Sequence, residues 1–554
     1  MKKTKLISIL AVILVLTLAL TVLAGCSQGN VPSDTPSITK KPEEGIKEEP
    51  TDDPDEFAKF RPIEGKVYEI TKANWIPGPV DNENGDMVKY YEEKLNASII
   101  SENIEAAQFT ELLSLRVASD EAPDIFQVRS FGDFKTFYDN QVMYGFSEEV
   151  FKEFAPSIYE ILLNESPNAF RYTRLDGENL YGVAGVRFHN QFVQPVVWRQ
   201  DWLENVGIDS IPDTLEEVEE ALYKFTREDP DQNGRDDTYG LSQWGMDAIF
   251  SMFGYSPMPF GSTMIWQEND GKLVYGGAQP EMKEALALLS KWYADGIIDP
   301  EFITSENKGG DGRLSHSLIN GRIGFTSGQE YFAWSPVEPK GMNINEFYNT
   351  NPNASENALA VTLPPIGTDG NRSNYQWPAI TPSVYAFSKD LENEPDKFGK
   401  ILEVFNHTLS DYDNYLTSWF GIEGEHWEMV DDAPTSIGIY TDNAERTRIG
   451  AYTHMAFNLE PDVYWGVMFK DRTEWAKSLG LDTQAVGHRN ELMTALPSMN
   501  RYQAELIKIR QEAYIAIITG DKPVDFFDEF VDNWNASGGS TLLEEANEWY
   551  SSIK

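Results

Sequence analysis

The 554-residue sequence is poor in cysteine and in positive charge. Its single cysteine, Cys26, excludes an intramolecular disulfide and a cysteine-rich zinc site. It contains 45 Lys and Arg residues and 89 Asp and Glu residues, which gives a formal net charge of −44. Nucleic acids and anionic lipid head groups both attract basic surfaces, so this balance argues against either as a partner.

Short motifs of the common enzyme classes are also missing. None of the six histidines lies four residues from another, and no glycine-rich phosphate or dinucleotide motif is present. The segment 324–328 comes nearest to a nucleophile elbow, but it has Thr326 where serine is required. A glycosidase needs only two carboxylates, so the many acidic residues leave that chemistry open.

Apolar residues nevertheless make up 41% of the chain, which is enough for a packed globular protein, and the length predicts two or more domains. From Lys66 onward, strand-like and helix-like segments alternate, which predicts a parallel α/β sheet. Ligands bind beyond the carboxyl ends of such strands. The strand-like segments are 67–70, 98–100 and 123–128, and the helical ones are 86–95 and 109–118.

The N-terminus has the pattern of a bacterial lipoprotein. A basic start precedes the uncharged, mostly apolar run 6–24, which is also long enough to be an uncleaved membrane anchor. The run leads to Leu-Ala-Gly-Cys, which resembles a lipobox, where the chain is cut before a lipidated cysteine. We therefore predict a signal peptide at 1–25 and a lipid on Cys26 that holds the protein at the extracellular face of the membrane of a Gram-positive-type bacterium. Residues 26–60, acidic and rich in proline, predict a disordered, extended tether.

Several sequence blocks resemble the extracellular solute-binding proteins of ABC transporters. Ala118-Ser119-Asp120 followed by Pro123-Asp124-Ile125-Phe126 is similar to one of their segments, and further similar blocks cover nearly the whole mature chain. These blocks are 197–214, 271–302 and 523–539. The large Gram-positive lipoprotein branch (LplA-like) of the family 1 proteins, associated with oligosaccharide uptake, is the best match.

The resemblance implies a two-lobed, periplasmic-binding-protein-like α/β fold of type II. Each lobe would be a sheet flanked by helices, and the chain would cross the hinge more than once, first near 181–198 and again near 377–387. The implied N-terminal lobe is 61–187 and 382–430, and the implied C-terminal lobe is 188–381 and 431–554.

The function implied by the resemblance is binding and not catalysis. The protein would be a monomer that captures an oligosaccharide by closing its lobes and delivers it to the transmembrane subunits of an ABC permease. Two alternatives remain open at this point. They are a surface-anchored glycan-degrading enzyme and a subunit that reports its ligand to a membrane sensor.

Tryptophans outside the predicted core helices are candidates for sugar contacts, although burial in the core is the alternative for each of them. An indole stacks on the apolar face of a sugar ring, while amides, carboxylates and guanidinium groups bind its hydroxyls. The acidic net charge favours a neutral or cationic sugar, unless a local arginine overrides it. The predicted ligand-binding residues are Trp75, Gln108, Arg129, Trp266, Trp334, Trp377, Glu423 and Trp427.

The segment 229–240 has the spacing of an EF-hand calcium loop, with oxygen-bearing side chains at positions 1, 3, 5 and 9 and glycine at position 6. Gly240 stands at position 12, where such loops have a bidentate glutamate. The segment therefore resembles the calcium loop of some relatives of this branch, and an Asx-rich turn is the alternative. The predicted ligands of a structural Ca²⁺ are Asp229, Asp231, Asn233, Asp237 and the backbone carbonyl of Arg235.

Overall fold

The structure is a computed structural model that describes residues 55–76, 85–105, 108–119, 121–305, 314–430, 433–452 and 459–554. Chain contacts separate the segment 1–55 from the folded body, 56–554. The predicted signal peptide, Cys26 and almost all of the tether lie outside the described residues. Within the described ranges, no helix combines the length and the apolar character that a membrane crossing requires.

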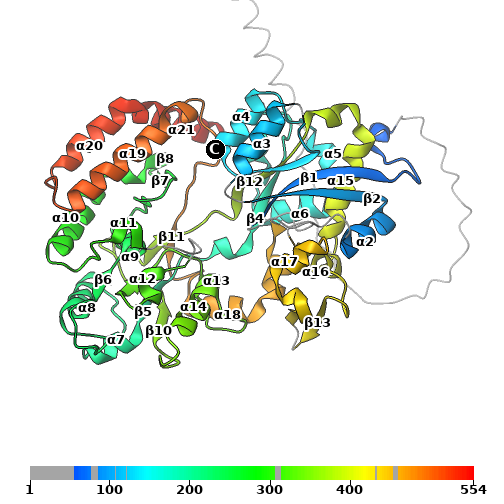
Figure 1. The fold of residues 1–554 in the computed structure, drawn as a ribbon. Coiled ribbons are helices and arrows are strands. Elements are labelled where there is room, and N and C mark those ends of the chain that lie inside the picture. The colour runs from blue at the N-terminus through cyan, green and yellow to red at the C-terminus, as the bar shows by residue number, and fades with distance from the viewer. Residues whose placement is uncertain are drawn as a thin grey trace, which may run out of the picture. The chain divides into compact units, whose positions relative to one another are not determined.

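The first sheet of the folded body contains six strands among the described residues, in the order β15-β4-β12-β3-β1-β2 (Figure 1). β1 pairs in parallel with β2 and with β3, which confirms the predicted parallel α/β sheet. β12 runs antiparallel to β3 and β4, because the chain re-enters the sheet at the edge where β4 leaves it. The strands are β1 (Tyr68–Ile76), β2 (Ala97–Glu105), β3 (Ile125–Val128), β4 (Val183–Arg187), β12 (Ile380–Phe387) and β15 (Leu459–Glu460).

Aromatic side chains dominate the core under this sheet. Phe398 belongs to helix α15, and its ring centroid lies 4.9 Å from that of Phe146 and 5.2 Å from that of Phe387 in β12. These ring contacts pack α15 against the sheet. Gly399 is required beside them, because a Cβ there would lie 1.8 Å from the Phe60 carbonyl oxygen. Helices that contribute to this core are α2 (Asp86–Leu95), α3 (Phe109–Ala118), α4 (Phe131–Asp139), α5 (Glu148–Phe154), α6 (Pro156–Glu165), α15 (Pro395–Thr408), α16 (Tyr412–Phe420), α17 (Asn443–Arg448) and α18 (Lys470–Leu479).

The second sheet has the order β10-β5-β9-β6 in the described chain, and it has its own core. Trp198 of β5 contacts the rings of Phe225 and Phe325, and all three are fully buried. Its strands are β5 (Val196–Arg199), β6 (Tyr239–Leu241), β9 (Ile323–Thr326) and β10 (Leu359–Thr362). Its helices include α7 (Gln200–Asn205), α8 (Leu215–Arg227), α9 (Gln243–Ser251), α10 (Glu281–Ala294), α13 (Tyr331–Trp334), α14 (Met342–Thr350), α19 (Met499–Ile518), α20 (Phe526–Trp534) and α21 (Ser540–Ser552).

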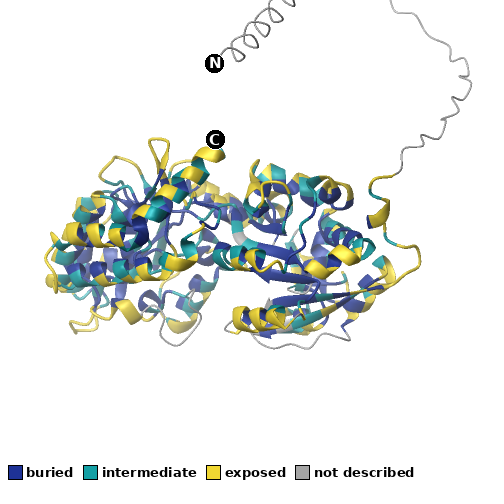
Figure 2. Cartoon of the chain, turned by 90° about the horizontal axis from the view of Figure 1, so that it is seen from above, coloured by how far each residue is buried: buried dark blue, intermediate teal, exposed yellow. Residues whose placement is uncertain are grey.

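Three strand pairs stand apart from the two sheets in the described chain. They are β7 (Trp266–Asn269) with β8 (Lys272–Tyr275), β11 (Ser373–Tyr375) with β16 (Val486–His488), and β13 (Trp427–Val430) with β14 (Ala433–Ser436). Figure 2 shows that buried residues run through both sheets, whereas exposed residues gather on the surrounding helices and turns.

The described chain passes between the two cores three times, through 188–195, 376–379 and 481–485. These crossings agree with a two-lobed fold. Residues after 430 also contribute to the first core, since β15 pairs with β4 and Leu481, Met493 and Ala495 belong to the first hydrophobic cluster.

Candidate functional site

Charged side chains gather where strands of the two sheets end. Arg129 follows β3, Arg187 ends β4, Glu460 ends β15, and Glu330 follows β9 of the second sheet. Glu460 is the direct neighbour of Arg187 in the parallel register of β15 and β4. We name these four residues the strand-end cluster.

Electrostatic coupling joins the members of the strand-end cluster across the two lobes. Burial raises the pKa of the Glu460 carboxyl to about 7, an effect that Glu330 reinforces and Arg187 opposes. Burial also lowers the pKa of the Arg129 guanidinium, and the nearby positive charge of Arg187 lowers it further. Because Glu330 belongs to the second lobe and the others to the first, the cluster lies at their junction.

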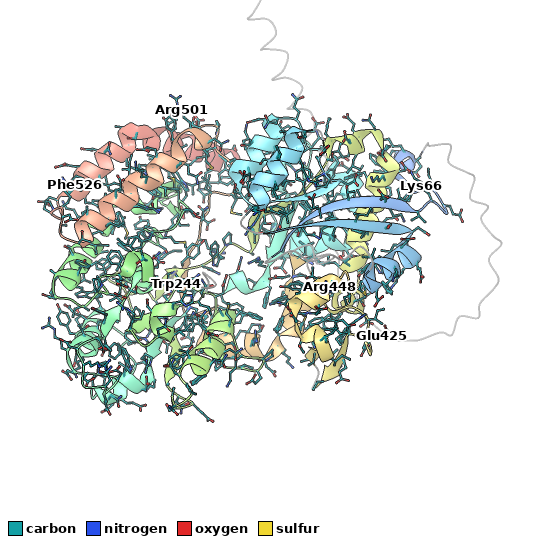
Figure 3. The ribbon with its side chains drawn as sticks, in the orientation of Figure 1. Lys66, Trp244, Glu425, Arg448, Arg501 and Phe526 are labelled. Carbon is teal, nitrogen blue, oxygen red and sulfur yellow. The ribbon has the colours of Figure 1, made fainter. Side chains whose placement is uncertain are left out.

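Trp244 brings an aromatic ring to the strand ends of the second sheet. It follows β6 in the first turn of α9, and Gly328 after β9 packs against it. A Cβ at position 328 would lie 2.7 Å from the indole, and the backbone there has a φ of +95°. Figure 3 shows Trp244 in the central part of the body, whereas Arg501 and Phe526 lie on its outer side.

Three of the predicted tryptophans are core residues in the structure. Trp266 and Trp334 keep 1% and 0% of their surface exposed, within two separate hydrophobic clusters. Trp427 is also buried, and its indole N–H donates to the carbonyl oxygen of Gly421 at 2.9 Å. Their rings are covered by protein, so the structure presents none of the three to a ligand.

The remaining predicted residues lie at the surface or at the junction. Gln108 is exposed at the N-cap of α3, and Glu423 is exposed on the turn after α16. Trp377 is partly exposed on the crossing 376–379, with its ring 4.9 Å from Tyr375 in an edge-to-face contact. Trp75 lies in β1, and its side chain falls outside what the structure describes. Arg129 follows β3 and Gln108 follows β2 at the same edge of the first sheet, and Trp377 lies on a chain crossing.

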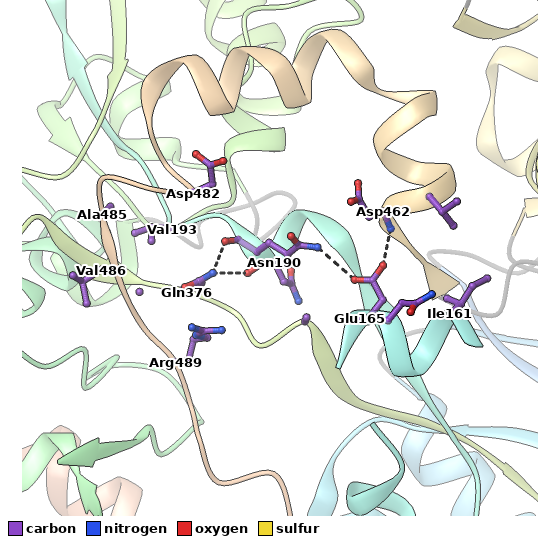
Figure 4. Close-up of a pocket in the computed structure, with 15 residues that line it drawn as sticks. Ile161, Glu165, Asn190, Val193, Gln376, Asp462, Asp482, Ala485, Val486 and Arg489 are labelled. Carbon is purple, nitrogen blue, oxygen red and sulfur yellow. Dashed lines mark hydrogen bonds between the residues drawn. The ribbon is translucent and has the colours of Figure 1, made fainter. Parts of the chain in front are cut away.

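A pocket of about 940 Å³ lies among the crossing segments (Figure 4). The Gln376 amide donates to the carbonyl oxygens of Asn190 and Gln191, which ties two crossings together. Glu165 of α6 accepts the backbone N–H of Asp462 at 2.8 Å, and burial raises the pKa of its carboxyl. The strand-end cluster and the predicted ligand-binding residues are not among the residues that line this pocket.

The loop 229–237 brings its carboxylates together around an amide. The Asn233 side-chain amide donates to Asp231 at 2.7 Å and to Asp237 at 3.1 Å, while Asp229 accepts the backbone N–H groups of Asn233 and Gly234. The pKa of Asp231 is raised by burial and then by its acidic neighbours. Among the described residues, however, no three His, Cys, Asp or Glu side chains are arranged to hold a metal ion.

The architecture is that of two-lobed solute-binding proteins. No family model matches the chain. The alginate-binding protein AlgQ2, in a structure without calcium ion, superposes with a TM-score of 0.63 and 17% identity over 88% of this chain and 98% of its own. The S. pneumoniae ABC-transporter substrate-binding protein FusA, in complex with kestose, gives a TM-score of 0.65 and 14% identity over 88% and 99% of the two chains.

Two sequence relatives come from Bacillus subtilis strain 168. The polygalacturonan/rhamnogalacturonan-binding protein YtcQ is 24% identical over 459 residues, which are 80% of this chain and 83% of YtcQ. The lipoprotein LipO is 22% identical over 415 residues, 73% of this chain and 78% of LipO. These comparisons confirm the predicted fold and the resemblance to solute-binding proteins of ABC transporters. The functions named among these proteins are those of binding proteins and not of enzymes.

Proposed function

We propose that the protein is the carbohydrate-binding component of an ABC importer, lipid-anchored through Cys26 outside the cell membrane, which hands an oligosaccharide to its permease. The observation that carries this proposal is the strand-end cluster, in which charged side chains of two lobes meet beside three chain crossings. The carbohydrate ligands named for YtcQ, AlgQ2 and FusA support the class of ligand.

Binding would close the two lobes on the ligand. A sugar that contacts Arg129 and Arg187 of the first lobe together with Glu330 of the second makes all its contacts only when the lobes approach. Such a ligand shifts the population toward the closed arrangement. Trp377 on the second crossing would stack on a ring held between the lobes.

A thermal-shift screen over neutral and acidic oligosaccharides tests the proposed function. A bound sugar raises the free energy of unfolding by RT ln(1 + [L]/Kd), which raises the melting temperature. Prolonged incubation with the protein should leave that sugar intact. If no saccharide stabilises the protein, or if the stabilising saccharide is degraded, the proposed function is wrong.

Truncating Trp377 should weaken binding of the sugar that the screen identifies. We expect Trp377→Ala to reduce affinity by roughly three- to tenfold in calorimetry, because an aromatic contact contributes about 0.5–1.5 kcal/mol. Trp475→Ala is the matched control, since Trp475 is also partly exposed but lies on α18, outside the second crossing. Equal affinities of the two variants would remove Trp377 from the site.

We also propose that the loop 229–237 binds a structural Ca²⁺. Its donors are carboxylate and amide oxygens, which suit calcium. The pKa of Asp231 is raised by burial and by the acidic groups beside it. Asp229, Asp231, Asn233 and Asp237 would supply side-chain oxygens after the Asn233 amide turns its oxygen inward, and Arg235 would supply its carbonyl. The bound cation would neutralise these carboxylates and fix the turn after α8.

Calcium removal should therefore destabilise the wild type. With free Ca²⁺ at one hundred times Kd, binding stabilises the fold by about 2.7 kcal/mol, and a chelator should abolish this gain in a thermal melt. Asp231→Ala should be insensitive to the chelator. Asp236→Ala, which removes an exposed carboxylate of the same loop that is not a predicted ligand, should respond like the wild type. A wild type that ignores the chelator leaves only the Asx-turn interpretation.

A further inference from the structure

Two arginines leave the same edge of the first sheet on either side of β12. Val128 of β3 and Ala184 of β4 both pair with Val384, so the strands that carry Arg129 and Arg187 flank one common strand. Two inter-strand spacings put these strands roughly 10 Å apart. Two guanidinium groups are thereby presented along one edge, at the junction of the lobes.

The positive charge of Arg187 is only partly balanced by its neighbours in the described chain. Glu460 is its neighbour in the strand register, and the two groups attract each other electrostatically. Glu460 is 7% exposed, and burial raises the pKa of its carboxyl to about 7, so near neutral pH it carries only part of a negative charge. An anionic group brought to Arg187 would therefore meet a cation that its neighbour only partly balances.

Helix geometry adds to the positive potential at this edge. α3 and α4 begin directly after β2 and β3, and they run for 10 and 9 residues. Their N-termini therefore lie at the edge where the two arginines emerge, and the N-terminal end of a helix favours negative charge. Ser130 caps α4 by accepting the backbone N–H of Asp133, whereas no side chain caps α3.

The net charge of the chain does not oppose a short-range anion site. Salt screens charge interactions beyond about 8 Å at physiological ionic strength, so contacts inside the site outweigh the distant acidic surface. Guanidinium groups bind planar carboxylates through paired hydrogen bonds.

We propose that the ligand is an acidic oligosaccharide whose uronic-acid carboxylates are bound by Arg187 and Arg129 at this edge. The proposal rests on the carbohydrate-binding function proposed above and adds the charge of the sugar. An acidic ligand differs from the neutral or cationic sugar that the net charge of the sequence alone favours.

Trigalacturonate and its fully methyl-esterified form provide the test, because the two differ in charge but not in the number of rings. Calorimetry should show that the acid binds at least tenfold more tightly than the ester. Arg187→Gln should lower the affinity for the acid about tenfold more than it lowers the affinity for the ester. Arg501→Gln makes the same change in net charge on the exposed face of α19 and should behave like the wild type (Figure 3).

Each outcome decides the proposal. Equal binding of acid and ester, or an Arg187→Gln variant with unchanged preference for the acid, overturns it. Binding of neutral oligosaccharides only also overturns it but keeps the proposed function. If no saccharide of either kind binds, the proposed function fails together with this inference.

Discussion

Replacing Arg510 by methionine should lower the free energy of unfolding by about 3–5 kcal/mol, because a buried hydrogen-bonded cation is removed and its partners are left unsatisfied. Arg510 is fully buried on α19. Burial raises the pKa of the neighbouring Asp247 carboxyl to about 7, and the positive charge of Arg510 opposes that shift. The Arg510 guanidinium donates to oxygen atoms of the segment before β7 and of β8, namely those of Pro257, Gly261, Thr263 and Tyr275.

Urea unfolding of the wild type and of Arg510→Met measures this loss. Arg501→Met is the control on the same helix, since Arg501 is exposed, and its effect should stay within about 0.5 kcal/mol. If the two variants unfold at the same urea concentration, the loop carbonyls find other partners and the guanidinium is not what holds them.

Replacing Cys26 by serine should release the protein from the membrane or leave it unprocessed. Cys26 is the only thiol in the sequence, so no other residue can accept the lipid. We expect nearly all wild-type protein in the membrane fraction. The serine variant should appear in the medium or retain residues 1–25, as mass spectrometry of its N-terminus would show.

Ser33→Ala, a change within the tether, controls for the handling of the N-terminal segment and should remain in the membrane fraction. A Cys26→Ser protein that stays in the membrane with a normally cut N-terminus would refute the lipoprotein interpretation. Retention of both variants with uncut N-termini would indicate an uncleaved anchor instead.

The local elements of the first lobe were predictable because their sequence periods are strong. The helical segments 86–95 and 109–118 coincide with α2 and α3, and the strand between them pairs in parallel as expected. β15 was not predictable, because two residues at a sheet edge carry no periodic signal. The lobe boundary at 430/431 was therefore predicted without β15, which pairs with β4.

The site was harder to predict because exposure depends on tertiary packing. Trp266 stands beside a tight turn, which suggests exposure, yet its hairpin packs on the C-terminal helices. Tyr275 of that hairpin stacks on Trp534 with ring centroids 4.6 Å apart. Arg129 was predicted because it follows the end of a strand. Arg187 at the end of β4 has the same placement, but the segment 181–185 was interpreted only as a hinge crossing.

The position of β12 in the first sheet has a consequence for how the chain folds. β12 lies between β3 and β4, yet almost two hundred residues, including all four described strands of the second lobe's sheet, separate β4 from it in the sequence. Until residue 387 has been synthesised, β3 and β4 present open hydrogen-bonding edges that invite pairing with other chains. Closing the sheet is therefore a late, long-range event, which makes folding slow and the nascent chain dependent on protection from aggregation.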